Sequence, residues 1–533
     1  MDPINRDPFF FGPKILPRRL TAGLRGWSLL KVRLLSLIKL VLLPLLSLNC
    51  GLGGELRIAR VFSDDGVLQR GTQVPVWGWA GSGAKVTVEF AGQSKTATSD
   101  ADGRWVVQLD PMKVQQAGSR MTVKSGEETL HIRGLLVGEV WYASGQSNME
   151  MNLDSCARKL AFVSDVIGEP ESRLIRTMRV GNADAPDELD DLPGPLRWQW
   201  DTPENRPGQS AAAYFFAREL HDELQVPIGI IESSWGGKPI EGFIPREKFL
   251  EYPKLKTILE LAGADQLERL AKTEGGVMIR NTAGMPGRIF NARVAPIAPY
   301  AVKGFIWYQG ESNAGAGEDP RNYHNKMRAL IEGWRDLWKQ GDLPFYFVQL
   351  PAFNDGASGW IRLREEQRLS LAVPGTGMAV TIDLRDSDIH PSNKVDVGKR
   401  LASWALAKNY GKSVPFSGPL FQAIKIEENK IRVSFEDVGD GLMTARKEGL
   451  DAPVETKGRD PGHFEIADSE GHWHAAKAEI EGRFVIVSSS KVANPVAVRY
   501  ACEGDPENAN LYNRAGLPAS PFCSRLDLLP WQE

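Results

Sequence analysis

The sequence predicts an α/β fold, with a parallel sheet flanked by helices at its centre and a β-sandwich-like domain at each end. Three observations carry this prediction. Short alternating runs broken by glycine turns fill residues 55–134, apolar strands alternate with helical stretches over residues 135–412, and the alternating pattern returns in residues 413–533. Repeated strand-then-helix order indicates a mostly parallel sheet covered on both faces, whereas period-two alternation with closely spaced turns is typical of sandwiches.

Residues 1–54 differ in kind from the rest and are expected to be an export segment. A basic stretch is followed by the apolar run LVLLPLLSL (40–48) and then by small residues, which is the pattern of a secretory signal. The apolar run has nine residues and contains Pro44, whereas a membrane-spanning helix needs about twenty, so no stable membrane span is expected. We therefore expect an exported protein, periplasmic or extracellular, with the true start and the cleavage site left open.

The alternation in residues 55–134 is clearest in TQVPVWGWAG, AKVTVEFAGQ and DGRWVVQLD. The central region instead contains five apolar strands, LLVGEVWYA, VPIGIIESS, VKGFIWYQG, LPFYFVQLP and GMAVTIDLR. Between them lie the helical stretches AAYFFARELHDEL, YHNKMRALIEGWRDLWKQ and DVGKRLASWALAKNY. In residues 413–533 the runs AIKIEENKIRVSFED and NPVAVRYAC predict a second β domain.

Composition excludes several classes of protein. With 533 residues, several domains are expected, and a net charge of −3 provides no positive field that would attract nucleic acid. Four cysteines are too few for a disulfide scaffold, and no paired His/Cys spacing suggests a metal site. Cys502 and Cys523 either form a disulfide in the exported protein or remain free thiols.

Polar residues follow each strand of the predicted parallel sheet, where ligands bind in open α/β folds. The four blocks are SGQSNM (144–149), SSWGGKPIE (233–241), QGESNAG (309–315) and DLRDSDIHPSNK (383–394). A serine hydroxyl is a weak nucleophile unless a base removes its proton. Of the seven histidines only His390 lies in a post-strand loop of the central region, so Ser147 and His390 form the best nucleophile and base pair.

Acyl transfer also needs hydrogen-bond donors for the oxyanion of the tetrahedral intermediate. The N–H of Ser147, a backbone N–H of Gly236 or Gly237 and the side-chain amide of Asn313 follow three different strands and are candidates for this role. Each block alone also fits an ordinary glycine turn or helix cap. Their occurrence at corresponding strand ends favours a shared site.

The motif around Ser147 is not a GxSxG nucleophile elbow, because Met149 replaces the second glycine. It resembles the SGNH-type esterases, and within them the sialate O-acetylesterase family of carbohydrate esterases. The resemblance rests on VWYASGQSNM, VPIGIIESSWGGKPIE, IAPYAVKGFIWYQGESNA and DIHPSNKVDVGKRLA, and it extends to VFSDDGVLQRGTQVPVWGWA and NLYNRAGLPASPF outside the central region. It implies an SGNH-hydrolase-like sheet, Ser147 as nucleophile, His390 as base, and Ser147, Gly236, Gly237 and Asn313 as oxyanion donors.

The acid that orients His390 is open. Many SGNH enzymes have Asp three residues before this histidine, but position 387 here is Ser. Asp388 is the nearest carboxylate in sequence, and Glu311 is the second candidate, as in related carbohydrate esterases. A backbone carbonyl in place of either acid is the third.

Together these features predict an exported serine esterase that removes O-acetyl groups from sugars without a cofactor or metal, with sialic acid as the expected substrate. The first alternative function is an esterase for acetylxylan or another acetylated polysaccharide. The second is a non-catalytic glycan-binding protein derived from an esterase. Residues 152–210, with DELDD (187–191), Trp198 and Trp200, are expected to form part of the rim of the site. The motifs do not determine the acetyl position or the oligomeric state.

Overall fold

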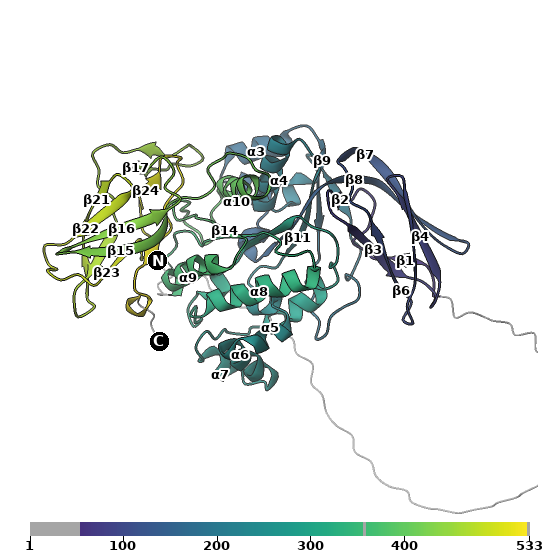
Figure 1. The fold of residues 1–533 in the computed structure, drawn as a ribbon, viewed down its shortest axis with the longest axis horizontal. Helices are drawn as coiled ribbons and strands as arrows, with labels where there is room; N and C mark the ends of the chain where they lie inside the picture. Colours follow the sequence, from purple (N-terminus) through teal and green to yellow (C-terminus); the bar gives the residue numbers. More distant parts are fainter. Residues whose placement is uncertain (1–53, 355–358, 530–533) are drawn as a thin grey trace, which may run out of the picture. The chain divides into compact units, whose positions relative to one another are not determined.

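The computed structural model describes residues 54–354 and 359–529, shown as a ribbon in Figure 1. Apart from its last residue, the expected export segment therefore lies outside the described residues. Within the described ranges no helix is both long and apolar enough to span a membrane.

The N-terminal module consists of two sheets that face each other across an apolar core. The first has the order β1-β3-β6, with β1 (Arg57–Ile58), β3 (Val74–Trp79) and β6 (Arg104–Leu109). The second contains β2 (Val67–Gln69), β4 (Lys85–Phe90), β5 (Gln93–Thr98), β7 (Gln115–Ser125) and β8 (Glu128–Gly145). Alternate residues of β4 and β6 are buried, as the period-two pattern predicts, and Trp105 lies on the buried face of β6.

The central sheet has the order β10-β9-β11-β8-β12-β13-β14. Every pair from β9 to β14 is parallel, and only β10 at the edge is antiparallel. The bounds are β9 (Ser172–Arg179), β10 (Trp198–Asp201), β11 (Ile228–Ser234), β12 (Gly304–Tyr308), β13 (Phe345–Val348) and β14 (Thr376–Ala379). All five predicted strands are present, and β9 and β10 were not predicted.

Helices cover both faces of this sheet because successive side chains of a strand point to opposite sides. On β8, Trp141 packs edge-on against Phe216 of α4 (Ala211–Leu224), which lies beside α10 (Lys394–Asn409). The next residue, Tyr142, instead contacts Trp334 of α8 (Tyr323–Trp338), which packs against α9 (Gly359–Leu369). The three predicted helices α4, α8 and α10 are thus confirmed as the two covering layers.

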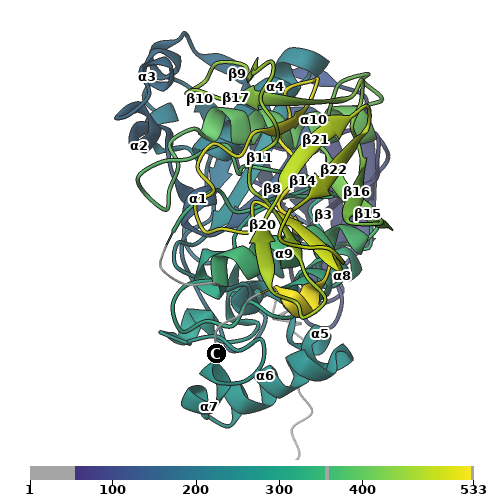
Figure 2. The same ribbon diagram turned by 90° about the vertical axis from the view of Figure 1, so that its left-hand side faces the viewer.

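Smaller helices were not predicted. α5 (Arg246–Glu251), α6 (Pro253–Gly263) and α7 (Leu267–Ala271) lie beyond α8, away from the sheet, in both ribbon views (Figures 1 and 2). Between β8 and β9 the chain forms α1 (Ser147–Glu150), α2 (Leu153–Ala157) and α3 (Ala161–Gly168). The segment after Ser147 is therefore largely helical.

The C-terminal module is all β, as predicted. Its sheets have the orders β15-β16-β22-β21, β18-β17-β24 and β20-β19-β23-β25. The bounds are β15 (Leu420–Glu427), β16 (Lys430–Glu436), β17 (Leu442–Arg446), β18 (Val454–Glu455), β19 (Phe464–Ala467), β20 (Trp473–Ala475), β21 (Lys477–Glu481), β22 (Phe484–Ser488), β23 (Ala497–Tyr500), β24 (Leu511–Asn513) and β25 (Phe522–Cys523). Figure 2 shows this module facing the viewer.

The expected boundaries at residues 134 and 412 do not separate independent cores. The first falls inside β8, an 18-residue strand that pairs with β7 in the N-terminal module and with β11 and β12 in the central sheet. One cluster of buried apolar side chains extends from Leu56 to Phe522 through all three modules. The described residues form a single compact unit.

Candidate active site

The site lies where the direction of chain progression across the sheet reverses. From β8 the chain first forms β9 and β11 on one side and then β12, β13 and β14 on the other, so the carboxyl end of β8 faces a crevice. Gly145 ends β8 with φ of 141°, and a Cβ there would lie 2.1 Å from the carbonyl oxygen of Tyr308 on β12. Only glycine permits this close approach, and Ser147 then begins α1 at the mouth of the crevice.

Ser147, His390 and Asp388 form a hydrogen-bonded chain. Nε2 of His390 lies 2.8 Å from Oγ of Ser147, and Nδ1 lies 3.1 Å from Oδ1 of Asp388. If Nδ1 carries the proton that Asp388 accepts, Nε2 has a lone pair for the serine hydroxyl. The backbone N–H of His390 also donates to Asp388 at 3.0 Å, and this bond, followed by the imidazole contact, lowers the pKa of Asp388. The arrangement has the geometry of a serine hydrolase triad.

Glu311, the other predicted acid, does not bond to the imidazole in the described structure. Its buried carboxylate accepts a hydrogen bond of 2.5 Å from Nδ2 of Asn148, which also donates to the carbonyl oxygen of Ile389 at 3.0 Å. Burial raises the pKa of Glu311, although the bond from Asn148 opposes this. The hydrogen bonds of Glu311 thus reach the histidine loop through Asn148, and its charge also interacts with His390 without a hydrogen bond between them.

Lys394 completes this buried network. Its Nζ donates to Oδ1 of Asn148 and to the carbonyl oxygen of Pro391, both at 2.6 Å, so Asn148 connects Glu311, the histidine loop and the start of α10. Burial lowers the pKa of Lys394 to about 8. Sequence reasoning did not assign Asn148 or Lys394 a role, although both stand inside the quoted motifs, in SGQSNM and PSNK.

The four predicted oxyanion donors differ in availability. Within the described structure the N–H groups of Ser147 and Gly237 have no intramolecular acceptor, and Gly237 is exposed at a turn with φ of 66°. By contrast, the N–H of Gly236 donates to Oε2 of Glu150 at 2.7 Å. Asn313 is fully buried, and its Nδ2 donates to Oε2 of Glu241 at 3.0 Å. Among the described residues, the backbone N–H groups of Ser147 and Gly237 are therefore free, and the amide of Asn313 has a second N–H besides the one that Glu241 accepts.

Glu150 and Arg179 are site residues that the sequence reasoning missed. Glu150 stands three residues after Ser147 in α1, a spacing that places side chains on the same face of a helix. Its Oε1 pairs with Arg179 at 2.6 Å, and Arg179 also contacts Glu232 of β11 at 3.3 Å. A carboxylate thus lies beside Ser147 and accepts a hydrogen bond from the N–H of Gly236, one of the predicted oxyanion donors.

A cavity of about 490 Å³ surrounds this group and is open to solvent. Besides Ser147, Asp388 and His390, its lining consists of Glu150, Met151, Asn152, Ser155, Arg158, Lys159 and Arg179. The expected rim is therefore right for Asn152, Ser155, Arg158, Lys159 and Arg179, whereas Leu153 and Cys156 are buried. It is wrong for Trp198, which is buried and donates to the carbonyl oxygen of Val61 in the N-terminal module at 3.3 Å.

Among the described residues no group of three His, Cys, Asp or Glu side chains is arranged to hold a metal ion. Cys156, Cys502 and Cys523 are all free and buried in this structure. Of the two states left open for Cys502 and Cys523, the structure shows the reduced one.

Comparison with known proteins finds the same family over nearly the whole chain. Residues 272–407 match the family model described as carbohydrate esterase, sialic acid-specific acetylesterase. The sialate O-acetylesterase of Rattus norvegicus is 30% identical, covering 93% of this chain and 98% of its own, and that of Homo sapiens is 30% identical over 89% and 93%. The crystal structure of a carbohydrate acetylesterase from Xanthomonas citri superimposes with a TM-score of 0.76 and 34% identity, covering 88% of this chain and 99% of that one.

Proposed function

The chain belongs to the sialate O-acetylesterase family, and from this premise we propose that it is an exported serine esterase that removes O-acetyl groups from sialic acids. The observation that supports this most directly is the Ser147–His390–Asp388 chain, with distances of 2.8 and 3.1 Å, at the carboxyl end of β8. Hydrolysis of acetylated polysaccharides is the second candidate, favoured by the structural similarity to a carbohydrate acetylesterase.

In the first half of the proposed reaction, Oγ of Ser147 attacks the acetyl carbonyl carbon while Nε2 of His390 takes the hydroxyl proton. The carbonyl oxygen becomes an oxyanion, for which the N–H groups of Ser147 and Gly237 are available donors. Asp388 holds the imidazole in the required tautomer and stabilises the imidazolium that forms. When the tetrahedral intermediate collapses, His390 gives its proton to the departing sugar oxygen, and the acetyl group remains on Ser147.

In the second half, water replaces the sugar in the open cavity. His390 takes a proton from this water, whose oxygen attacks the acetyl carbonyl and forms a second tetrahedral intermediate. Collapse releases acetate and returns the proton from His390 to Oγ of Ser147. Residues of this chain take part in every proton transfer of the proposed reaction.

Initial rates on O-acetylated sialic acids and on acetylated xylan test this proposal. We expect the mature protein to hydrolyse p-nitrophenyl acetate and acetylated sialic acids, with a higher kcat/KM on sialic acids than on xylan, and to be inactivated by a serine-directed phosphonate. Well-folded Ser147→Ala should lose this activity. Retention of most activity in Ser147→Ala, or loss of activity in EDTA that zinc restores, would refute the serine mechanism. A higher kcat/KM on xylan would select the second candidate.

The export proposal rests on the basic stretch and the apolar run LVLLPLLSL within the first fifty residues. We expect protein recovered from the periplasm or the medium to begin near residue 50. Sequencing the N-terminus of exported material tests this directly, and exported protein that begins at residue 1 would contradict it.

A further inference from the structure

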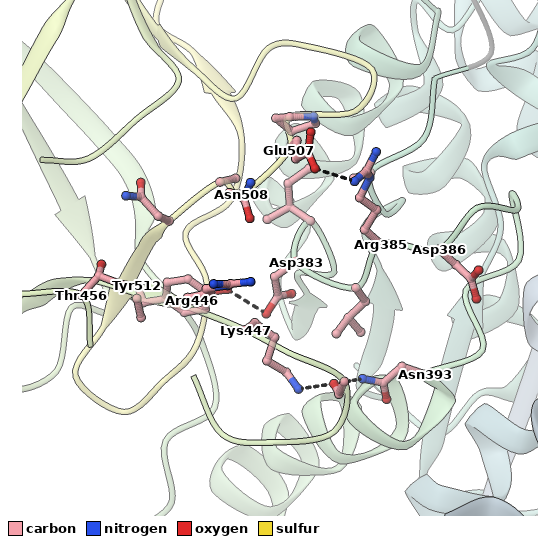
Figure 3. Close-up of a pocket in the computed structure, with 18 of the residues that line it drawn as sticks. Asp383, Arg385, Asp386, Asn393, Arg446, Lys447, Thr456, Glu507, Asn508 and Tyr512 are labelled. Atoms are coloured by element: carbon pink, nitrogen blue, oxygen red, sulfur yellow. Dashed lines mark hydrogen bonds and ion pairs between the residues drawn. The ribbon is translucent and has the colours of Figure 1, made fainter. Parts of the chain in front are cut away.

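A second cavity of about 590 Å³ lies behind the histidine loop, between the central and C-terminal modules (Figure 3). One wall is the loop after β14, which includes Asp383, Arg385 and Asp386, and the opposite wall is formed by segments of the C-terminal module. A volume of this size falls in the range of small-molecule and cofactor sites. The lining is rich in charged and amide side chains, which bind hydroxyl and carboxylate groups.

The two walls are connected by hydrogen bonds at both ends of the loop. Arg385 pairs with Asp505 at 2.8 Å and with Glu507 at 3.0 Å, and Asn393 donates to the carbonyl oxygen of Gly449 at 3.1 Å. Lys447 donates to the same carbonyl oxygen at 2.7 Å (Figure 3). The cavity is thus bounded by fixed contacts on both sides.

Each acidic side chain of the lining already has a cationic partner. Asp383 accepts two bonds from Arg400, at 2.6 and 2.8 Å, and one from Tyr512 at 3.2 Å. Asp386 pairs with Lys159 at 3.0 Å, and Glu507 pairs with Arg385. The carboxylates of the cavity are therefore neutralised by protein groups.

The cations of the lining are also paired, with one exception among the described residues. Arg446 and Lys447 pair with Glu448 and Asp396, neither of which lines the cavity. The guanidinium of Arg459 is exposed and has no partner among the described side chains. Because Arg385 is shared by Asp505 and Glu507, these pairs leave no net excess of positive charge, and the unpaired cation that an entering anion would meet among the described residues is Arg459.

The cavity adjoins the active site. Lys159 lines both cavities, and the loop that contributes Asp386 to one contributes Asp388 and His390 to the other. The two cavities therefore meet at Lys159, whose ion pair with Asp386 at 3.0 Å a sugar chain extending from Ser147 would have to pass.

We propose that this cavity binds acidic sugars of the glycan that carries the O-acetyl group, with Arg459 and Arg446 contacting their carboxylates. The proposal rests on the proposed function, and it makes the preferred substrate an acidic oligosaccharide. A single carboxylate held by an arginine contributes about 1.5–3 kcal/mol, which corresponds to a 10-fold or greater effect on affinity.

The test is calorimetric titration of the mature protein with unacetylated α2,8-linked trisialic acid, with neutral xylotriose as the comparison ligand. We expect trisialic acid to bind at least 10-fold more tightly than xylotriose, and Arg459→Ala to reduce its affinity about 10-fold. Lys457→Ala is the matched control: it lies on the same loop, is exposed, has no partner in the described chain and does not line the cavity. Equal affinities for the two ligands, or equal losses in both variants, would overturn the proposal.

Kinetics provide a second readout and separate this proposal from the proposed function. For an O-acetylated trisialoside, Arg459→Ala should raise KM about 10-fold and leave kcat nearly unchanged. If the wild-type protein has a KM for the trisialoside that is not lower than its KM for the acetylated monosaccharide, the cavity proposal is overturned. The proposed esterase activity would be unaffected by this result. Binding of trisialic acid that depends on Arg459, in a protein that hydrolyses no acetyl ester, would support the cavity and refute the esterase.

Discussion

At the scale of single residues, the site depends on side chains whose partners come from distant parts of the sequence. Asp388 reaches the imidazole from the same loop, whereas Glu311 acts on that loop through Asn148. Glu150 reaches the N–H of Gly236, 86 positions away. Glu311 and Glu150 therefore contact amide and backbone groups around the site and do not bond to the imidazole in the described structure.

Replacing Asp388 or Glu311 by the corresponding amide should lower kcat to different extents. Asp388→Asn should lower kcat by two to four orders of magnitude, because an asparagine favours the wrong imidazole tautomer, an effect of about 10⁴-fold in serine proteases. Glu311→Gln retains a carbonyl oxygen for Asn148 and should lower kcat less than 10-fold. Rates on p-nitrophenyl acetate, with thermal unfolding as the control for folding, make the comparison. A larger loss in Glu311→Gln would assign the triad acid to Glu311, and two small losses would indicate a backbone carbonyl.

Removal of the charge on Glu150 should increase the rate. In the proposed mechanism, the carboxylate that accepts from the N–H of Gly236 places negative charge near a candidate donor to the oxyanion. The carboxylate of Glu150 and an oxyanion about 4 Å away would repel each other by about 1 kcal/mol in water and by more in a partly buried site. Glu150→Gln removes this repulsion and should therefore raise kcat about fivefold. Glu150→Asp, which keeps the charge, is the control. A fall in kcat for Glu150→Gln alone would show that the carboxylate assists the reaction.

At the scale of elements, the loop between β14 and α10 positions the histidine. It is held at its start by Arg385 and at its end by Asn393, and Asp386 fixes its middle. Oδ2 of Asp386 accepts bonds from the N–H and the hydroxyl of Ser392, at 3.2 and 2.9 Å, and Oδ1 pairs with Lys159. The loop is thus closed on itself and fastened to the segment after α2.

The contribution of Asp386 to stability should depend on pH. Burial alone would raise its pKa, but the bonds from Lys159 and Ser392 lower it to about 2. Because the folded-state pKa lies below the ordinary value near 4, the stabilisation is present above pH 4 and is lost as pH falls toward 2. After allowing for solvent screening, Asp386→Asn should reduce the free energy of unfolding by about 1 kcal/mol at pH 7. Urea unfolding at pH 7, 4 and 3 checks this, and a difference that grows on acidification would contradict it.

At the scale of the whole molecule, the C-terminal module is part of the esterase core. Arg364 of α9 is buried and donates to the carbonyl oxygen of Gly504 at 3.0 Å. Gln349, after β13, donates to Oγ of Ser520 at 2.9 Å. These bonds join the sheet that carries the site to the last β strands.

Removal of residues 413–533 should therefore abolish folding of the remainder. Truncation would expose apolar surface of the common core and leave the buried guanidinium of Arg364 without its carbonyl partners. We expect the truncated chain to be insoluble or to lack a cooperative thermal transition, whereas the intact mature chain unfolds in one transition by calorimetry. A soluble truncated chain that still hydrolyses p-nitrophenyl acetate would refute this.

The sequence by itself determined the class of the fold and the positions of Ser147 and His390. Both follow from local patterns: buried strands are continuous apolar runs, helices repeat at 3.6 residues, and polar blocks mark the ends of strands. β9 and β10 escaped prediction because β9 carries arginines at positions 173, 176 and 179 and β10 is a short edge strand, so neither reads as a continuous apolar run.

Only the tertiary structure decided which acid contacts the imidazole of His390, which predicted oxyanion donors already have an acceptor, and whether the modules share one core. The choice between Asp388 and Glu311 depends on side-chain direction across a loop, which no spacing specifies. The bond from Gly236 to Glu150 and the second cavity each join segments far apart in the chain. Local sequence determines which residues end a strand, but packing between distant segments determines which of their polar groups meet.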